Sequence, residues 1–264
     1  MDLKLQGKRA LVSGSTMGIG FAIAESLARE GTSVIISGRG RERVDAAVKK
    51  LRDAGAKGEI TGVAADLGTR AGVDSLTRQI PAVDILVNNL GIYEPKPFEQ
   101  ITDEDWLKFY EVNVLSGIRL SRFYLPGMKQ RNWGRIVFIS SESAVNIPME
   151  MMHYGMTKTA QLAIARGLAE TTAGTGVTVN SVLPGPTRSE GVEQFVQAMA
   201  SAAKTDVAGV EKEFFKTVRP SSLIKRFATP EEVAAMVTFV CSPLSSATNG
   251  AALRVDGGVV RSII

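Results

Sequence analysis

Short apolar runs alternate with longer amphipathic segments along the chain. The apolar runs are rich in β-branched residues, and most precede a helical pattern: "RALVSG", "SVIISG", "EITGVAAD", "VDILVNN", "GRIVFISS", "VTVNSVLPG" and "AALRVDGG". Near-continuous apolar strands separated by helices are typical of parallel strands that are buried on both faces. The pattern therefore predicts a single α/β domain over residues 1–264, with a doubly wound parallel sheet of about seven strands, helices on both faces and right-handed crossovers.

Composition and charge narrow the choice of partner. The net charge is +4, from 31 basic and 27 acidic residues that are scattered along the chain. Such a mild excess favours a small anionic ligand and argues against nucleic acid. One cysteine and one histidine leave little for a disulfide framework or a metal site. Because no run approaches the length of a membrane span, we expect no membrane partner and a cytoplasmic location.

Three glycines follow the first predicted strand and open the first helix, at Gly14, Gly18 and Gly20. A glycine turn that leads into a helix N-terminus exposes backbone N–H groups, and the helix dipole favours an anion there. The spacing differs from the common G-x-G-x-x-G fingerprint, so a plain tight turn remains an alternative. The position directly after the first strand favours dinucleotide binding on a Rossmann-type sheet.

The end of the second predicted strand indicates which dinucleotide binds. That strand ends in Ser37-Gly38-Arg39, and no acid follows before Glu42. An acid here would bind the ribose 2′-hydroxyl of NAD, whereas a guanidinium can bind a 2′-phosphate with two hydrogen bonds. NADP(H) is therefore favoured over NAD(H). The alternative is that Arg39 is only a solvated loop residue.

Polar side chains collect where later strands end, close to a tyrosine–lysine pair. Tyr154 and Lys158 are spaced to share one face of a helix. A nearby ammonium would lower the pKa of the tyrosine toward neutrality. The fourth strand ends in "VNNLG" and the fifth in "FISSES", which brings Asn88 and Ser141 to the same carboxyl edge of the sheet.

Taken together, "SGSTMGIG", "NNLG", "YGMTK" and a serine thirteen residues before Tyr154 resemble the short-chain dehydrogenase/reductase family. Within it the chain is similar to the 3-oxoacyl-[acyl-carrier-protein] reductase-like branch. The resemblance implies that Tyr154 is the general acid/base, that Lys158 binds the nicotinamide ribose and lowers the tyrosine pKa, that Ser141 holds the substrate oxygen, and that Asn113 supports a water in the proton relay. The cofactor contacts that we expect are Gly14, Ser15, Thr16, Gly18, Ile19, Gly20, Arg39, Asp66, Leu67, Asn88, Gly91, Tyr154, Lys158, Pro184, Gly185 and Thr187.

Residues 188–226 interrupt the strand–helix rhythm and contain no strand pattern. Such long connections are more often functional than idle, and the resemblance identifies this one as a substrate lid. Its apolar residues either roof the substrate or pack on the body or on another subunit: Phe195, Met199, Phe214 and Phe215. The resemblance also implies a homotetramer, with a dimer possible, through long helices around 103–129 and 152–173.

The sequence therefore predicts an NADP(H)-dependent oxidoreductase that interconverts a small-molecule carbonyl and a secondary alcohol by hydride transfer, with no metal. Two alternatives stay open. One is an NAD-dependent dehydrogenase of the same family that acts on a hydroxy compound. The other is a dinucleotide-binding sensor that has lost turnover.

Overall fold

The computed structural model describes residues 1–203 and 205–263, without the side chains of residues 194, 195, 198, 199, 202 and 203. Its strands are β1 (Arg9–Val12), β2 (Ser33–Gly38), β3 (Ile60–Ala64), β4 (Ile85–Asn88), β5 (Gly134–Ile139), β6 (Val177–Pro184) and β7 (Ala252–Val255). Its α-helices are α1 (Gly18–Arg29), α2 (Arg41–Asp53), α3 (Arg70–Gln79), α4 (Asp103–Tyr110), α5 (Ser116–Gln130), α6 (Met152–Thr171), α7 (Glu190–Ala203), α8 (Val207–Thr217) and α9 (Pro230–Cys241).

All the strand pairs in the sheet are parallel, and the order is β3-β2-β1-β4-β5-β6-β7. The chain builds outward from β1 to β3 and then returns to place β4 on the other side of β1. This reversal is a topological switch point, and ligands of open α/β sheets bind beyond the carboxyl ends of the strands there. The predicted seven-stranded, doubly wound Rossmann-type sheet is confirmed.

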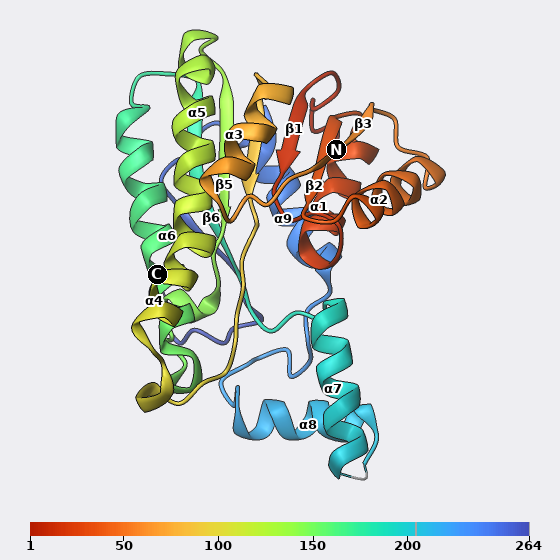
Figure 1. The fold of residues 1–264 in the computed structure, drawn as a ribbon, viewed down its shortest axis with the longest axis vertical. Coiled ribbons are helices and arrows are strands. Elements are labelled where there is room, and N and C mark those ends of the chain that lie inside the picture. Colours follow the sequence, from red (N-terminus) through yellow and green to blue (C-terminus); the bar gives the residue numbers. More distant parts are fainter. Residues whose placement is uncertain (204, 264) are drawn as a thin grey trace.

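Alternate residues of each strand point into two separate apolar layers. On one face, strand residues such as Val12 and Ile36 pack with α1, α2 and α9; on the other, Leu11 and Ile35 pack with α3, α5 and α6. Figure 1 shows the two helical layers on either side of the sheet. Because each strand is covered on both faces, its sequence is almost continuously apolar, which is why the strands were predictable.

The helix expected over 103–129 is not continuous. α4 and α5 are separated by one π-helical turn over Glu111–Leu115, with i→i+5 rather than i→i+4 geometry. Such turns are rare and occur often at functional sites. This one contains Asn113, whose side chain is 1% exposed.

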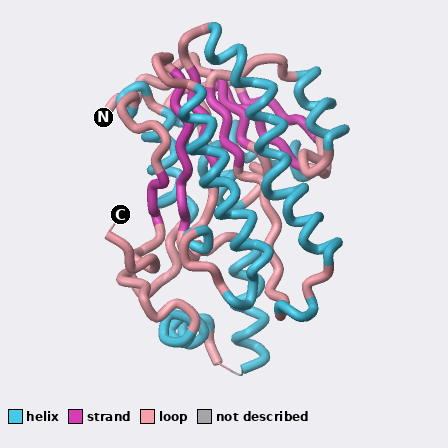
Figure 2. Tube along the Cα trace, turned by 90° about the vertical axis from the view of Figure 1, so that its left-hand side faces the viewer, coloured by secondary structure: helices cyan, strands magenta, loops and turns pink. Residues whose placement is uncertain are grey.

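Residues 188–226 form a separate helical unit beyond the carboxyl edge of the sheet. α7 and α8 lie away from the sheet in Figure 1 and extend from the domain in Figure 2. They have a small apolar core of their own, which includes Val196, Val210 and Phe215 and is completed by Phe227. No helix in the described part of the chain is long and apolar enough to cross a membrane.

Candidate active site

The glycine turn after β1 is held tightly against the loop after β4. Gly14 and Gly18 have φ of 62° and 57°, where a side chain is strained. A Cβ at Gly20 would lie 2.4 Å from Asn89 Nδ2 and 2.6 Å from the Gly14 carbonyl oxygen. Asn89 Nδ2 in turn donates to the Gly14 carbonyl oxygen at 3.0 Å. The turn is therefore a fixed structure and not a flexible loop.

The N-terminus of α1, at the end of this turn, is left open. Its N-cap residue is Met17, no side chain caps the helix, and no acid lies in its first turn. The first N–H groups of a helix need a partner from outside the helix. An anionic pyrophosphate fits these donors and the helix dipole.

The end of β2 lies beside the turn and has a free positive charge. A Cβ at Gly38 would lie 2.6 Å from Thr16 Cγ2, so the end of β2 and the glycine turn are in contact. Arg39 is exposed, and among the described residues it makes no ion pair. Asp66, at the end of β3, is also exposed, and its carboxylate accepts from the Gly68 N–H at 3.1 Å.

Several predicted cofactor contacts have partners inside the protein. The Ser15 hydroxyl donates to the Val12 carbonyl at 2.7 Å and accepts from the Ser37 N–H at 3.0 Å. Leu67 is buried in the core, and Asn88 Nδ2 donates to Ser121 Oγ at 3.1 Å toward α5. These three side chains hold the walls of the site together, so any cofactor contact by them stays a prediction.

The other predicted contacts lie at the carboxyl ends of β4 and β6. Gly91 lies over the lysine ammonium, since a Cβ there would be 3.5 Å from Lys158 Nζ. Pro184 ends β6, and a Cβ at Gly185 would lie 2.6 Å from the Asp256 carbonyl oxygen. The Thr187 hydroxyl donates to the Gly185 carbonyl at 2.9 Å. The floor of the site is thus made of residues that approach the neighbouring backbone closely.

The structure separates the serines that follow β5. The Ser140 hydroxyl donates to the Lys158 carbonyl at 2.8 Å, which ties β5 to α6. Ser141 Oγ accepts from the Ser143 N–H at 3.1 Å and lies against the Tyr154 hydroxyl. The geometry therefore favours Ser141, and not Ser140, as the serine that works with Tyr154.

Burial sets the protonation of Tyr154 and Lys158. Desolvation of the hydroxyl raises the pKa of Tyr154 to about 12, although hydrogen bonding to Ser141 opposes this. Desolvation also lowers the pKa of Lys158 to about 7. The expectation of a tyrosine pKa near neutrality is therefore wrong, because burial outweighs any lowering by the Lys158 ammonium. The ammonium lies 5.5 Å from the centre of the Tyr154 ring and donates to the Ile139 carbonyl at 2.8 Å instead.

Asn113 is locked in place by three neighbours. Its side chain exchanges two hydrogen bonds with the backbone of Ile92, at 2.7 and 2.9 Å, and donates to Thr157 Oγ1 at 3.0 Å. The backbone carbonyl of Asn113 accepts from Gln161 Nε2 at 2.6 Å. The π turn thus connects the loop after β4 to the helix that carries Tyr154 and Lys158.

The lid residues divide into two groups. Phe214 and Phe215 pack against each other and against Phe227, with ring centres 5.0 to 5.1 Å apart, inside the lid's own apolar core. The expectation that Phe215 roofs the substrate is corrected, because this side chain is 3% exposed among its lid neighbours. Phe195 and Met199 lie outside the residues whose side chains are described.

Sequence reasoning missed a buried ion pair beside the candidate catalytic serine. Arg219, which follows α8, donates from Nε to Glu142 Oε1 at 2.9 Å and lies 3.5 Å from Glu150. Glu142 Oε2 is buried without a partner in the described structure, and burial raises the pKa of this carboxyl. Only the position of Glu142 directly after Ser141 could have suggested it. The pair connects the end of the lid to the catalytic loop.

Comparisons with known proteins agree with this geometry. A sequence family described as enoyl-(acyl carrier protein) reductase matches residues 14–260. The chain is 52% identical to the uncharacterized oxidoreductase YvaG of Bacillus subtilis, over 100% of both chains. It is 34% identical to the 3-oxoacyl-[acyl-carrier-protein] reductase FabG of Aquifex aeolicus, over 98% of this chain and 100% of that one.

The chain belongs to the short-chain dehydrogenase/reductase family. Among solved structures, L-sorbose reductase from Gluconobacter frateurii, complexed with NADPH and L-sorbose, superposes with a TM-score of 0.94 at 31% identity and covers 100% of both chains. The protein is an oxidoreductase that acts on CH–OH groups, and its fold and nucleotide-binding turn are those of this short-chain dehydrogenase/reductase family.

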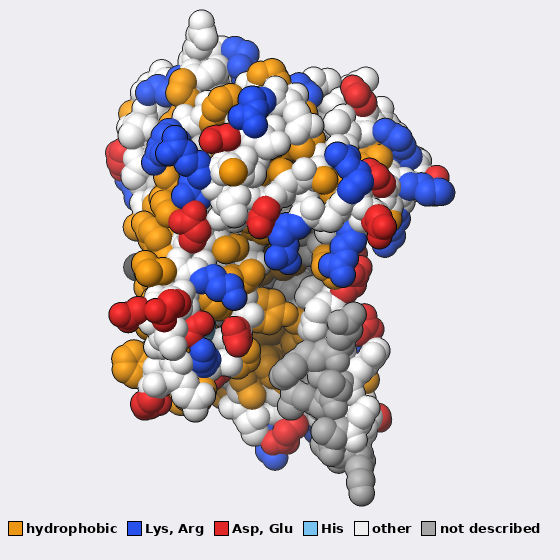
Figure 3. Space-filling view, in the orientation of Figure 1, with side chains coloured by type: hydrophobic (Ala, Val, Ile, Leu, Met, Phe, Trp, Pro, Cys, Tyr) orange, Lys and Arg blue, Asp and Glu red, His pale blue; other side chains and the backbone are white. Residues whose placement is uncertain are grey.

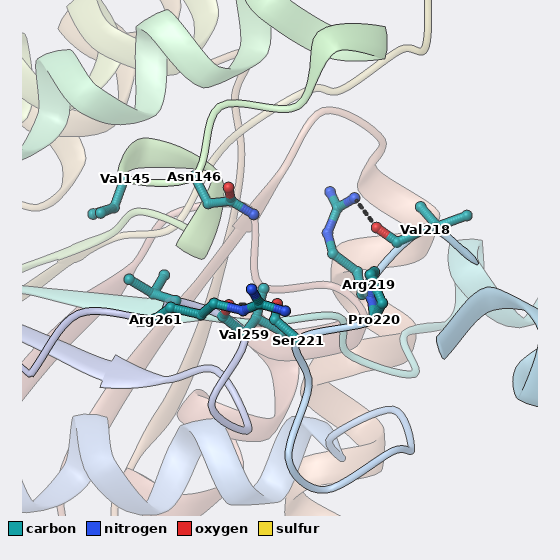
Figure 4. Close-up of a pocket in the computed structure, with 9 residues that line it drawn as sticks. Val145, Asn146, Val218, Arg219, Pro220, Ser221, Val259 and Arg261 are labelled. Atoms are coloured by element: carbon teal, nitrogen blue, oxygen red, sulfur yellow. Dashed lines mark hydrogen bonds between the residues drawn. The ribbon is translucent and has the colours of Figure 1, made fainter. Parts of the chain in front are cut away.

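This short-chain dehydrogenase/reductase also has a cavity at the end of the lid, beside Arg219. A cavity of about 470 Å³ is lined by Val145, Asn146, Val218, Arg219, Pro220, Ser221, Val259, Val260 and Arg261, and none of the four candidate catalytic residues lines it. Figure 4 shows the Arg219 guanidinium turned back to the Val218 carbonyl. The described residues contain no group of three or more His, Cys, Asp or Glu side chains that could hold a metal ion.

Proposed function

We propose that this short-chain dehydrogenase/reductase interconverts a small-molecule carbonyl compound and a secondary alcohol with NADP(H) as the cofactor. One observation carries the proposal. Ser141, Tyr154 and Lys158 lie together at the carboxyl edge of the sheet, and α1 begins at the same edge with an N-terminus that no side chain caps. Hydrogen-bonding groups for a substrate oxygen and free donors for a pyrophosphate therefore lie at the same edge.

Each side chain has a role that its own contacts support. Ser141 Oγ accepts from the Ser143 N–H and lies against the Tyr154 hydroxyl, so a substrate oxygen placed beside this pair could accept a hydrogen bond from each hydroxyl. Tyr154 is neutral at physiological pH, because burial raises its pKa to about 12, so its hydroxyl holds a proton for a developing alkoxide. The Lys158 ammonium stabilises negative charge on that tyrosine as the proton leaves. Bound NADP(H) would supply or accept the hydride.

Arg39 supports the choice of NADP(H) over NAD(H). It is exposed, it has no ion-pair partner among the described residues, and it follows a strand that ends without an acid. The L-sorbose reductase that superposes on the whole chain is complexed with NADPH. A 2′-phosphate placed beyond Gly38 would meet a free guanidinium and no carboxylate.

The lid supports a sheltered substrate site. α7 and α8 extend beyond the carboxyl edge of the sheet, and Figure 3 shows hydrophobic side chains gathered in the hollow between them and the domain. A lid here would exclude water while hydride moves. Glu142 and Arg219 would form a polar end of this hollow, and the side chains of Phe195 and Met199 stay candidates for its roof.

We also propose a homotetramer. Large apolar side chains are exposed on α4 and α5, with Leu107 68%, Tyr110 39% and Phe123 46% exposed. Burial of these side chains against a second copy of the chain would remove an apolar face from water. Light scattering of the purified protein tests this, and a monomer at micromolar concentration contradicts it.

The experiment that tests the function is a comparison of Tyr154→Phe with the native protein. Native protein is screened with NADPH against ketoses and 3-oxoacyl thioesters, and with NADP against the matching alcohols. Tyr154→Phe should abolish turnover of the best substrate and leave NADPH affinity nearly unchanged. Turnover that survives in Tyr154→Phe contradicts the mechanism, and NADPH binding without any turnover in the native protein favours a sensor.

A further inference from the structure

One buried amide connects the candidate catalytic lysine to the π turn. Gln161 lies on α6, one turn after Lys158, and is 1% exposed. Its Nε2 donates to the Asn113 carbonyl at 2.6 Å, and its Oε1 accepts from Lys158 Nζ at 3.4 Å. We propose that Gln161 is a positioning residue that orients the Lys158 ammonium and helps to keep it protonated. This inference rests on the proposed function, in which Lys158 acts on the cofactor and on Tyr154.

The orientation of this amide follows from its surroundings. The Asn113 carbonyl can only accept a hydrogen bond, so the NH₂ group of Gln161 must face it. The carbonyl oxygen of Gln161 is then turned to Lys158 Nζ, which can only donate when it is charged. If the amide were flipped, Gln161 Oε1 would face the Asn113 carbonyl oxygen, which is also an acceptor. The NH₂ group of Gln161 would then face the Lys158 ammonium, which is also a donor. Asn113 thus fixes which atom of Gln161 the lysine meets.

The hydrogen bonds of Lys158 show why this acceptor matters. The ammonium has three N–H groups, one of which donates to the Ile139 carbonyl at 2.8 Å and a second to Gln161. No carboxylate pairs with it in the described part of the chain. A Cβ at Gly91 would come within 3.5 Å of Nζ, so the missing side chain leaves room beside the ammonium for a partner of its third N–H. Two neutral oxygens thus hold the charge and leave one donor toward the site.

Burial makes Lys158 sensitive to the loss of either oxygen. A lysine that is 4% exposed and has no counter-charge is easily deprotonated, and its pKa is already lowered to about 7. A hydrogen bond to a charged group favours the charged form, so the loss of one acceptor should lower the pKa of the group by about one unit. Removal of the Gln161 oxygen should therefore deprotonate Lys158 near neutral pH.

The alternative is that Gln161 only satisfies the Asn113 carbonyl and so stabilises the π turn. Thr157 offers a matched control, because its hydroxyl accepts from Asn113 Nδ2 at 3.0 Å and no hydrogen bond joins it to Lys158 in the described structure. Thr157→Val loosens Asn113 without changing the acceptors of Lys158. A purely structural role predicts that Gln161 and Thr157 variants behave alike.

The test measures the pKa of Lys158 directly, by NMR of ¹³C-lysine-labelled, cofactor-free protein, with Lys158→Met to assign the resonance. Gln161→Met, which keeps the side-chain length, should lower the pKa by about one unit, and Gln161→Glu should raise it by about one unit or more. Thr157→Val should leave it unchanged. The midpoint of the pH profile of kcat/KM should move in the same two directions.

Equal Lys158 pKa values in native protein and Gln161→Met overturn the proposal, as does a shift of the same size in Thr157→Val. If Gln161→Glu does not fold, because its carboxylate would face the Asn113 carbonyl, the comparison of Gln161→Met with Thr157→Val still distinguishes a positioning role of Gln161 from a purely structural one. Failure of the proposed function has a separate signature. Lys158→Met would then keep full turnover, whatever the resonance of Lys158 does in the Gln161 variants.

Discussion

α1 and α9 lie side by side on one face of the sheet, and they begin in opposite ways. α9 closes its own N-terminus: Thr229 accepts from the Glu232 N–H, Glu232 bonds back to the Thr229 N–H, and Pro230 occupies the first turn. α1 has Met17 at the same position and no capping side chain. The first N–H groups of α1, the helix that faces the switch point, have no side-chain acceptor, whereas those of α9 are capped.

The difference shows how the fold makes room for a ligand. α3, α4 and α8 are capped by Thr69, Thr102 and Asp206, as α9 is by Thr229. α1 and α2 begin without a side-chain cap, and both follow strands that end at the predicted cofactor edge. Open N–H groups cost stability unless a partner completes them. We infer that the cofactor is that partner for α1.

The largest effect should come from closing the glycine turn. In Gly20→Ala the new Cβ would lie 2.6 Å from the Gly14 carbonyl oxygen, so the turn must move. Such overpacking costs about 1–3 kcal/mol of stability, and we expect NADPH affinity to fall by about tenfold or more. Gly167→Ala is the control, because nothing lies within 4 Å of that Cβ on α6. NADPH affinity that is unchanged in Gly20→Ala refutes the assignment of the turn.

The next effect should come from giving α1 the cap that it lacks. Met17 is 39% exposed, so Met17→Asp can place a carboxylate over the first N–H groups of the helix. We expect a gain of about 1 kcal/mol in the ligand-free protein. We also expect weaker NADPH binding, since the carboxylate occupies the donors and repels a pyrophosphate. Met17→Leu should change neither quantity, and equal NADPH affinity in Met17→Asp would show that α1 is not the pyrophosphate site.

Removal of the cap of α9 should give the converse result. Thr229→Ala deletes the oxygen that accepts from the Glu232 N–H. Urea denaturation should show a loss of about 1 kcal/mol, with NADPH affinity unchanged and Thr229→Ser close to native. If Thr229→Ala weakens NADPH binding as much as Met17→Asp does, the two helix ends do not differ in function.

The two regions should also differ in how their contribution to stability depends on pH. At the cofactor edge, burial lowers the pKa of Lys158 from 10.5 to about 7. The unfolded chain binds more protons between these values, so stability rises with pH through this window and is lost as pH falls. At α9, Arg226 and Thr229 lower the pKa of Glu232 from 4.5 to about 2, so stability present above 4.5 is lost as pH falls toward 2.

Urea titrations over pH check both signs. The difference in free energy of unfolding between native protein and Lys158→Met should change between pH 7 and 10.5 and stay constant in acid. The difference between native protein and Glu232→Gln should change only in acid, and weakly, because Glu232 is 42% exposed and solvent screens its ion pair. If the difference in free energy of unfolding between native protein and Lys158→Met does not vary with pH above pH 7, the burial of an ammonium without a counter-charge is contradicted.

The sheet and the nucleotide turn were predictable because their sequence signals are local. Strands that are covered on both faces read as apolar runs, and the glycines of the turn stand at the end of the first run. The spacing of Tyr154 and Lys158 placed them on one face of a helix, and the resemblance to known proteins supplied Ser141 and Asn113.

Contacts between distant segments could not be predicted in the same way. The π turn keeps the apolar pattern of an ordinary helix, so 103–129 was expected as a single helix. Arg219 meets Glu142 and Gln161 meets Asn113 across the fold, at separations that no periodicity reveals. His153, the one histidine of the chain, is fully buried against Phe109, because α4 packs on α6 there.

The measurement that tests the central claim most directly is a fluorescence titration with NADPH and with NADH, at matched salt, of native protein and Arg39→Gln. Native protein should bind NADPH about tenfold or more tightly than NADH, since a lost charged hydrogen bond costs about 1.5–3 kcal/mol. Arg39→Gln should lose most of that preference and keep its affinity for NADH. Equal binding of both cofactors by native protein, or a preference that Arg39→Gln retains, contradicts the account.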